Sequence, residues 1–241
     1  MPSPFRLLPL FVGSACIFGQ EHSLGDVIVV AADSRAVAGD GNKNPDICKI
    51  RIAGDYFFTL HGVGDADILA GISEALRASG TLSAKAIGLR DKYVDTILRR
   101  LQSAPELKTS GIMIFGRERG ILKLVYVQFL AHAATPSERS HIYECPGTDC
   151  PGGIVTNSAS PYGDQLSTNA RTLDDVREFV TSQIDKARKI EQSTGKVEFV
   201  GAPLQSMRLN KSGKHEWRDK PDVCIEPELA SAVLPELDSH P

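Results

Sequence analysis

The sequence lacks any apolar run of the roughly 20 residues that a helix needs to cross a membrane. It also lacks a long basic segment, because 27 Lys and Arg residues are outnumbered by 30 Asp and Glu residues and the net charge is −3. No surface for nucleic acid is therefore indicated. Hydrophobic residues at 41% and charged residues at 24% exclude a wholly disordered or fibrous chain. These absences leave a globular protein with no expected membrane span and no expected nucleic-acid partner.

The first twenty residues resemble an export signal in their order of residue types. Arg6 precedes the apolar run 7–12, and the small residues 13–15 follow it. A basic start, a short apolar stretch and small residues before a cleavage point are typical of secretory signal peptides. This interpretation predicts a periplasmic or secreted protein. Two alternatives stay open: the segment is the propeptide of a cytoplasmic protein, or it is the first strand of the fold.

Cysteine usage bears on the compartment. The chain has five cysteines, at positions 16, 48, 145, 150 and 224. If Cys16 leaves with a signal peptide or carries a lipid, the remaining four can form two disulfides in an oxidising compartment, and Cys145 with Cys150 could close a local loop. The same two residues could also stay as free thiols. A zinc site would need a second close Cys pair or a His-rich segment, and neither is present, so we expect no metal and no cofactor.

Hydrophobic periodicity predicts the order strands, helix pair, strands, helix, strands. The predicted strands are 15–20, 26–33, 48–52, 56–60, 111–116, 121–129, 197–200, 205–209 and 215–217. One helix is predicted from Asp67 to Gly80 and another begins at Thr172. Between them a helix capped by Thr81 or Ser83 should turn Ile87, Val94, Ile97, Leu98 and Leu101 inward. The stretch 134–169 is predicted to be loop.

Helices on both outer faces of two packed antiparallel sheets make a four-layer αββα sandwich of the α+β class. No linker divides the middle of the chain. We therefore expect an N-terminal signal or propeptide at 1–19, which includes part of the first predicted strand, and a single domain at 20–225. The tail 226–241 carries acidic residues and prolines without Lys or Arg, and we expect it to be disordered.

Three sequence blocks resemble one protein family and stand in its register. They are Ala31-Ala32-Asp33-Ser34-Arg35-Ala36, Lys49-Ile50, and Leu60-His61-Gly62-Val63-Gly64-Asp65-Ala66-Asp67. Asp33 and Lys49 are sixteen positions apart, and Lys49 and Asp67 are eighteen apart. In this pattern the chain resembles the N-terminal nucleophile (Ntn) hydrolases, specifically the 20S proteasome β-type subunits and their bacterial relatives. The resemblance covers 15–218 more loosely, and it implies the αββα fold and self-association into a ring-like homo-oligomer.

The resemblance also implies roles for particular residues. Asp33 and Lys49 match the family's buried acidic and basic pair, and Gly62-Val63-Gly64 matches a Gly-rich turn that donates backbone amides to an oxyanion. A nucleophile at a mature N-terminus can use its own α-amine as the base, since the pKa of that amine lies near neutrality. A nearby ammonium group then favours the anionic nucleophile. His61, next to the turn, either lines a pocket or makes a local hydrogen bond at the end of a strand.

The nucleophile is where the sequence departs from the family. The family's catalytic Thr should fall at 15–17, but the first Thr of this chain is Thr59. Ser14 and Cys16 are the nucleophilic side chains near that point, and cleavage after Ala15 would give Cys16 a free α-amine. The family's later Asp before Ser-Gly, and its Gly-Ser-Gly stretch, have no clear counterpart, so their roles are not carried over.

Two classes of function remain. The first is an amide-bond hydrolase that acts on peptides or small amides and is made active by N-terminal processing. The second is a catalytically inactive member of the same fold, serving as a scaffold or an exported binding protein. In the second class Asp33 and Lys49 would persist because loss of one leaves the buried charge of the other without a partner. A mature N-terminus at Cys16 supports the first class, and one at Gln20 or later supports the second.

Overall fold

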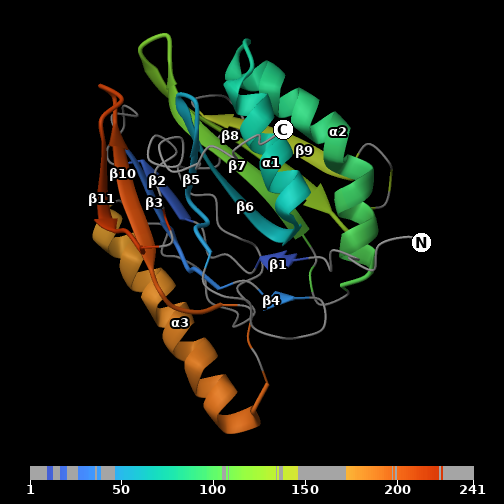
Figure 1. The fold of residues 1–241 in the computed structure, drawn as a ribbon, viewed down its shortest axis with the longest axis vertical. Helices are drawn as coiled ribbons and strands as arrows, with labels where there is room; N and C mark the ends of the chain where they lie inside the picture. The colour runs from blue at the N-terminus through green and yellow to red at the C-terminus, as the bar shows by residue number, and fades with distance from the viewer. Residues whose placement is uncertain are drawn as a thin grey trace, which may run out of the picture.

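The computed structural model describes residues 10–12, 17–20, 27–35, 37–38, 47–104, 107, 109–133, 135, 138–145, 172–196, 198, 200–222 and 224. These residues form two antiparallel sheets and three helices (Figure 1). The expected Cys16 nucleophile, Cys150 and the tail 226–241 lie outside the described residues.

The larger sheet has the strand order β4-β1-β6-β7-β8-β9, and β5 also pairs with β6. Its strands are β1 (Leu10–Val12), β4 (Val37–Ala38), β5 (Arg51–Ala53), β6 (Tyr56–Gly64), β7 (Thr109–Glu118), β8 (Ile121–Leu130) and β9 (Ser140–Cys145). The strand β1 pairs with the end of β6 on one side and with β4 on the other. The N-terminal apolar run thus contributes a strand to this sheet.

The smaller sheet has the order β11-β10-β3-β2. Its strands are β2 (Ile17–Gln20), β3 (Val27–Ala32), β10 (Gln205–Asn210) and β11 (His215–Asp219). The predicted first hairpin is present, because β2 pairs antiparallel with β3 from Ile17 opposite Ala31 to Gln20 opposite Ile28. The central strand β3 is therefore hydrogen-bonded on both edges.

Helices cover the outer faces of both sheets, which gives the four-layer αββα sandwich expected from the sequence. The helices α1 (Ala66–Arg77) and α2 (Leu82–Gln102) pack on the larger sheet, and α3 (Leu173–Thr194) packs on the smaller one (Figure 1). The two sheets face each other through a separate apolar layer built from Ile28, Val30, Phe57, Met113, Phe115 and Met207 among others.

The continuous apolar runs of the central strands follow from this layering. In β3, Ile28 and Val30 face the layer between the sheets, whereas Val29 and Ala31 face α3. Both faces of the strand are therefore removed from water, so alternation of apolar and polar residues is lost. The same holds for β6, where Phe57 faces the opposite sheet and Phe58 faces the helices.

Side-chain caps define the helix ends that the sequence indicated. Thr81 accepts a hydrogen bond from the Ala84 amide at 3.3 Å and caps α2, which leaves Ser83 inside the helix. Thr172 and Asp175 form a reciprocal capping box at the start of α3. At the end of α1, the buried Lys85 ammonium of α2 donates to the carbonyl oxygens of Leu76 at 2.9 Å and of Ala78. The two helices are thus joined by a cation at the negative end of α1.

Three details of the sequence prediction are wrong. The stretch 134–169 was expected to be loop, but it contains β9, a half-exposed strand that pairs with β8 and has no apolar alternation. Among the described residues of 197–200 there is no strand. Ile87 was expected inside, but it is 45% exposed because it lies on the outer side of α2.

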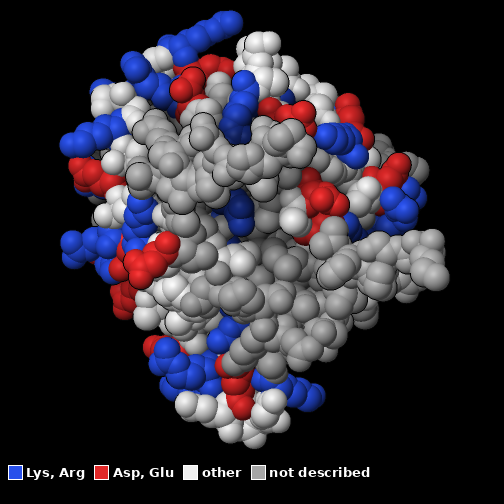
Figure 2. All heavy atoms as spheres, viewed as in Figure 1, with Lys and Arg blue, Asp and Glu red and all other residues white. Residues whose placement is uncertain are grey.

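Charges of both signs are interspersed over the described part of the face shown in Figure 2. This agrees with the small net charge of −3. Among the described residues, none of the helices combines the length and the apolar character required to span a membrane.

Candidate active site

A buried ion pair connects the end of β3 to the segment before β5. The Lys49 Nζ atom lies 2.6 Å from Asp33 Oδ1, and both side chains are fully removed from solvent. The second carboxylate oxygen of Asp33 accepts hydrogen bonds from the backbone amides of Gly201 at 2.9 Å and Arg35 at 3.1 Å. The structure therefore brings together the two charged residues that the sequence singled out.

The surroundings of Asp33 act on its ionisation in two opposite ways. Burial raises the pKa of the carboxyl, because the charged form loses its hydration. The Lys49 ammonium and the amides of Gly201 and Arg35 oppose that rise by stabilising the carboxylate. The charge of Asp33 thus depends on Lys49, and the two residues act as a unit.

Gln205, at the start of β10, holds the segment that carries Lys49. Its side-chain oxygen accepts from the amides of Lys49 at 2.9 Å and Ile50 at 3.1 Å. Its side-chain nitrogen donates to Ser34 Oγ at 2.5 Å and to the Ile47 carbonyl at 2.8 Å. One buried side-chain amide therefore makes hydrogen bonds with both chain segments that bear the ion pair. It positions Lys49 against Asp33.

The start of β2 lies beside this end of β3. Ile17 is the Cα partner of Ala31, and Asp33 follows Ala31 by two residues. The structure thus brings the residue immediately after Cys16 to the strand end that carries the ion pair. Cys16 itself was the predicted nucleophile, and it lies outside the described residues.

The predicted oxyanion turn at Gly62-Val63-Gly64 is a strand and not a turn. These residues are the last three of β6, all buried, and they pair with Val12, Phe11 and Leu10 of β1. The Val63 amide donates to Ser110 Oγ at 3.2 Å. The glycines allow close contact: at Gly62, with φ of +81°, a Cβ would lie 2.7 Å from the Thr109 carbonyl oxygen. Glycine here reflects crowding and backbone conformation within a paired strand.

His61 is buried within β6, immediately before the Gly62–Gly64 stretch. Its Nε2 atom lies 2.9 Å from the Tyr126 hydroxyl, and the two rings stack with centroids 5.6 Å apart. Burial first, and then the positive charge of Lys49, lower its pKa from 6.5 to about 4. Within the described part of the chain, His61 Nδ1 has no hydrogen-bond partner. A neutral imidazole therefore lies within electrostatic reach of Lys49.

Stability should fall in mild acid because of His61. The unfolded chain takes up a proton near pH 6.5, whereas the folded chain resists it down to about pH 4. Folding is therefore penalised as pH falls through this window, by about 3 kcal/mol in total. His61→Gln cannot take up this proton, and its stability should decline less between pH 7 and pH 4.5. Denaturant titrations at several pH values measure the difference, and identical profiles for both proteins would contradict the assignment.

Two residues of the site had no clear signal in the sequence. Tyr126 is one aromatic residue within an apolar strand, and Gln205 is a polar residue at a strand start. A buried glutamine opening an apolar strand is a weak indication of backbone hydrogen bonding. Among the described residues, no group of three or more His, Cys, Asp or Glu side chains is placed to hold a metal ion.

The fold is similar to a solved structure of Anbu from Hyphomicrobium sp. strain MC1. The match covers 87% of this chain and 88% of that one, with 15% identity and a TM-score of 0.51. A Gly-1 mutant of the same protein matches over 91% and 93% of the chains, with 17% identity and a TM-score of 0.45. No protein-family model and no curated protein matches the sequence. The first likeness shows a proteasome-related fold of the Ntn-hydrolase type.

Proposed function

We propose that this chain is an amide-bond hydrolase of the N-terminal nucleophile type, with peptides or small amides as substrates. Cleavage between Ala15 and Cys16 would make Cys16 the mature N-terminus and the nucleophile. The observation that supports this most is the fully buried Lys49–Asp33 pair, at 2.6 Å, beside the beginning of β2. A positive charge beside an N-terminal thiol lowers the pKa of that thiol, and a buried ammonium group next to the mature N-terminus would supply this charge.

The reaction follows from these groups. The α-amine of Cys16 takes the proton of its own thiol, and the positive charge of Lys49 favours the resulting thiolate. The thiolate attacks the amide carbon, and a C–S bond forms as the carbonyl oxygen takes the negative charge. Collapse of this intermediate breaks the C–N bond, and the leaving amine takes the proton from the α-ammonium group. Water, deprotonated by the α-amine, then hydrolyses the thioester and restores the thiol.

The position of β1 supports a peptide as the substrate. Leu10–Val12 lie between β4 and β6 and pair antiparallel with both strands. An extended segment is thus held by backbone hydrogen bonds on two sides, which is how peptides bind by strand addition. Cleavage after Ala15 would release this segment and free the edge of β6 at Gly62–Gly64. A substrate peptide can then take its place, and the freed amides can donate to the oxyanion.

A specific observation favours the non-catalytic alternative. The Val63 amide already donates to Ser110 Oγ, and the Lys49 side chain is completely buried. If both groups stay in these positions after maturation, neither can reach a substrate. The chain would then be a scaffold or binding protein in which the ion pair serves stability alone.

Location and assembly belong to the same proposal. Cys48 and Cys224 form a disulfide, and Cys145 is also disulfide-bonded. Disulfides persist in oxidising compartments, which supports a periplasmic or secreted protein over a cytoplasmic one. The family resemblance supports self-association into a ring. Light scattering on the purified protein measures its mass in solution.

The mature N-terminus tests the proposal. Intact-mass analysis of protein from the native host should find a chain that begins at Cys16. That chain should cleave members of a fluorogenic peptide-amide panel, and Cys16→Ala should lower kcat/KM by about 10³-fold or more. Ser14→Ala is the control for processing, because Ser14 leaves with the cleaved segment and the mature variant should have the same sequence and activity as the wild type.

Other outcomes reject the hydrolase. A mature chain beginning at Gln20 or later has lost the nucleophile and supports the non-catalytic alternative. Equal activity of Cys16→Ala and the wild type rejects Cys16 as the catalytic thiol. A chain that begins at Cys16 but cleaves no member of the panel also counts for the alternative.

A further inference from the structure

A hollow lies at the end of the sandwich opposite to the Gln205 end of β10. The strand β6 runs away from this hollow, from Tyr56 to Gly64, and β10 runs from Gln205, which holds Lys49, toward the turn at Ser212. The hollow has a volume of about 610 Å³. Three hairpin turns line it: the β5–β6 turn, the β7–β8 turn and the β10–β11 turn.

Positive charge dominates the lining of this hollow. Among the described lining residues, Arg77 at the end of α1 and Arg117 and Arg119 of the β7–β8 hairpin contribute three guanidinium groups, against one carboxylate from Asp55. Within the described part of the chain, none of these three arginines makes a side-chain hydrogen bond or an ion pair, and all three are exposed. This contrasts with Arg35, Arg100 and Arg177, each of which is bound to a carboxylate.

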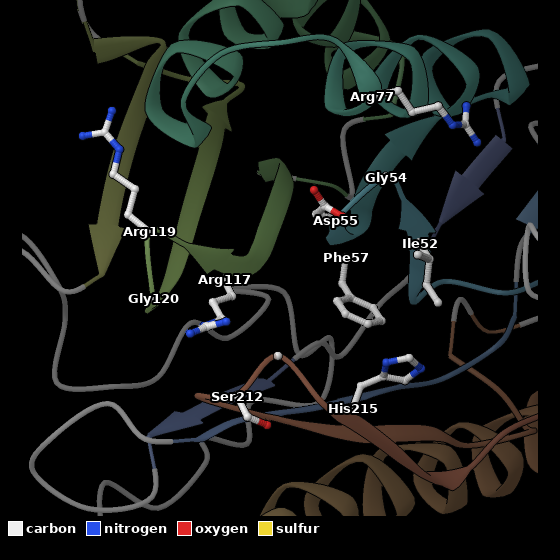
Figure 3. A pocket seen from close by; sticks show the side chains of 11 residues that line it. Ile52, Gly54, Asp55, Phe57, Arg77, Arg117, Arg119, Gly120, Ser212 and His215 are labelled. Atoms are coloured by element: carbon white, nitrogen blue, oxygen red, sulfur yellow. The ribbon is translucent and has the colours of Figure 1, made fainter.

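Arg117 occupies the central position among the three. Figure 3 shows it between its own hairpin and the β10–β11 turn, with Arg119 and Arg77 on either side, their side chains pointing away from it. A Cβ placed on Gly213 would lie 3.5 Å from Arg117 Cδ, so its side chain spans the two hairpins. Gly120 and Gly213 have φ of +85° each, and as tip residues without side chains they leave the space around Arg117 open.

Aromatic rings form the inner wall. The rings of Phe57 and His215 meet edge to face with centroids 5.0 Å apart (Figure 3), and Phe57 also stacks on Phe115. Phe57 is buried, so the wall is held in place by the core between the sheets. A flat apolar group can pack against this wall while an anionic group reaches the rim.

We propose that this hollow binds a small organic anion that joins an aromatic ring to a phosphate or carboxylate group. The ring packs against His215, which covers the edge of Phe57. The anionic group is held by Arg117, with the charges of Arg119 and Arg77 adding attraction at the rim. Guanidinium groups match the oxygen geometry of phosphate and carboxylate, and charge-assisted hydrogen bonds are the strong ones. The hollow is separate from the candidate active site, so this inference does not depend on hydrolase activity.

Calorimetric titration with four probes tests the site on the full chain. Phenyl phosphate and phenylacetate should bind, inorganic phosphate should bind more weakly because it lacks the ring, and benzyl alcohol should not bind because it lacks the charge. The stronger of the two aromatic anions identifies whether phosphate or carboxylate is preferred. Binding should weaken as salt is raised.

Arginine variants locate the binding. Arg117→Gln should weaken phenyl phosphate by about tenfold, and Arg117→Gln/Arg119→Gln should weaken it further. Arg188→Gln, an exposed residue of α3, is the matched control and should leave the affinity unchanged. The exposed position of Arg117 means that its replacement should not affect folding, which a thermal melt checks. If neither phenyl phosphate nor phenylacetate binds to the wild type, or if the double variant binds them as well as the wild type does, the proposal is overturned.

Discussion

Replacing Lys49 with methionine is expected to lower the free energy of unfolding by about 3–5 kcal/mol at pH 8. The variant keeps the length of the side chain but removes the ammonium group that lies 2.6 Å from Asp33. The carboxylate then stays buried without its charged partner, and the two backbone amides that it accepts from do not replace a full positive charge. Urea denaturation of the wild type and the variant measures the difference.

Two comparisons separate this effect from a general loss of lysine. Lys214→Met removes an ammonium group whose side chain is 71% exposed, and it should change stability by less than about 0.5 kcal/mol. Asp33→Asn/Lys49→Met removes both charges and keeps an acceptor for the amides of Gly201 and Arg35. This double variant should be more stable than Lys49→Met alone. If it is no more stable, the cost of Lys49→Met does not come from the stranded charge.

The penalty should also depend on pH. Without Lys49, burial raises the pKa of Asp33 further, because the main opposing charge is gone. The folded variant then binds a proton that the unfolded chain releases at its ordinary pKa, so the variant loses stability as pH rises through this window. The deficit relative to the wild type should be smaller at pH 5 than at pH 8. A deficit that is the same at both pH values would mean that Asp33 keeps its charge in the folded variant at both.

The loss of stability is expected for both candidate functions, whereas the effect of Lys49→Met on activity distinguishes them. In the hydrolase, loss of the ammonium group should also reduce the thiolate fraction of Cys16 and with it kcat at neutral pH. In a scaffold protein, stability alone should change.

The sequence predicted the parts of the fold that depend on local pattern. The run 26–33 indicated a strand buried on both faces, and β3 is such a strand. Thr172 with a helical apolar stripe indicated α3, and its capping box is present. Asp33 and Lys49 were placed together by their spacing within the family resemblance, and they are in contact. Each of these signals depends either on neighbouring residues in the sequence or on the spacing of the blocks that resemble the family.

Features that depend on tertiary packing could not be predicted. The strand β9 is a partly exposed edge strand, so it lacks the apolar pattern that marks a core strand. The Gly62–Gly64 stretch has turn-forming residues, but pairing with β1 and the close approach of β7 make it a strand. Gln205 and Tyr126 reach the site from strands far along the chain. Their partners are set by the topology, which no local pattern encodes.

The Cys48–Cys224 disulfide joins residues 176 positions apart, and local spacing gave no indication of it. It attaches the end of the described chain to the residue before Lys49. Both sulfur atoms lie near the Gln205 side-chain oxygen, at 3.8 Å from Cys48 and 3.6 Å from Cys224. The same glutamine holds the Lys49 amide, so the cross-link supports the segment that carries the buried ammonium group.

Removing this disulfide should therefore have one of the largest effects on stability. Chain-entropy arguments give about 5 kcal/mol for a loop of this length, and losses of about 2–5 kcal/mol are typical. Cys48→Ala/Cys224→Ala should lose about 3–5 kcal/mol in urea denaturation relative to the oxidised wild type. Wild-type protein unfolded in the presence of a reductant should approach the stability of the variant. A loss below about 1 kcal/mol would show that Gln205 and the surrounding core hold the Lys49 segment without the cross-link.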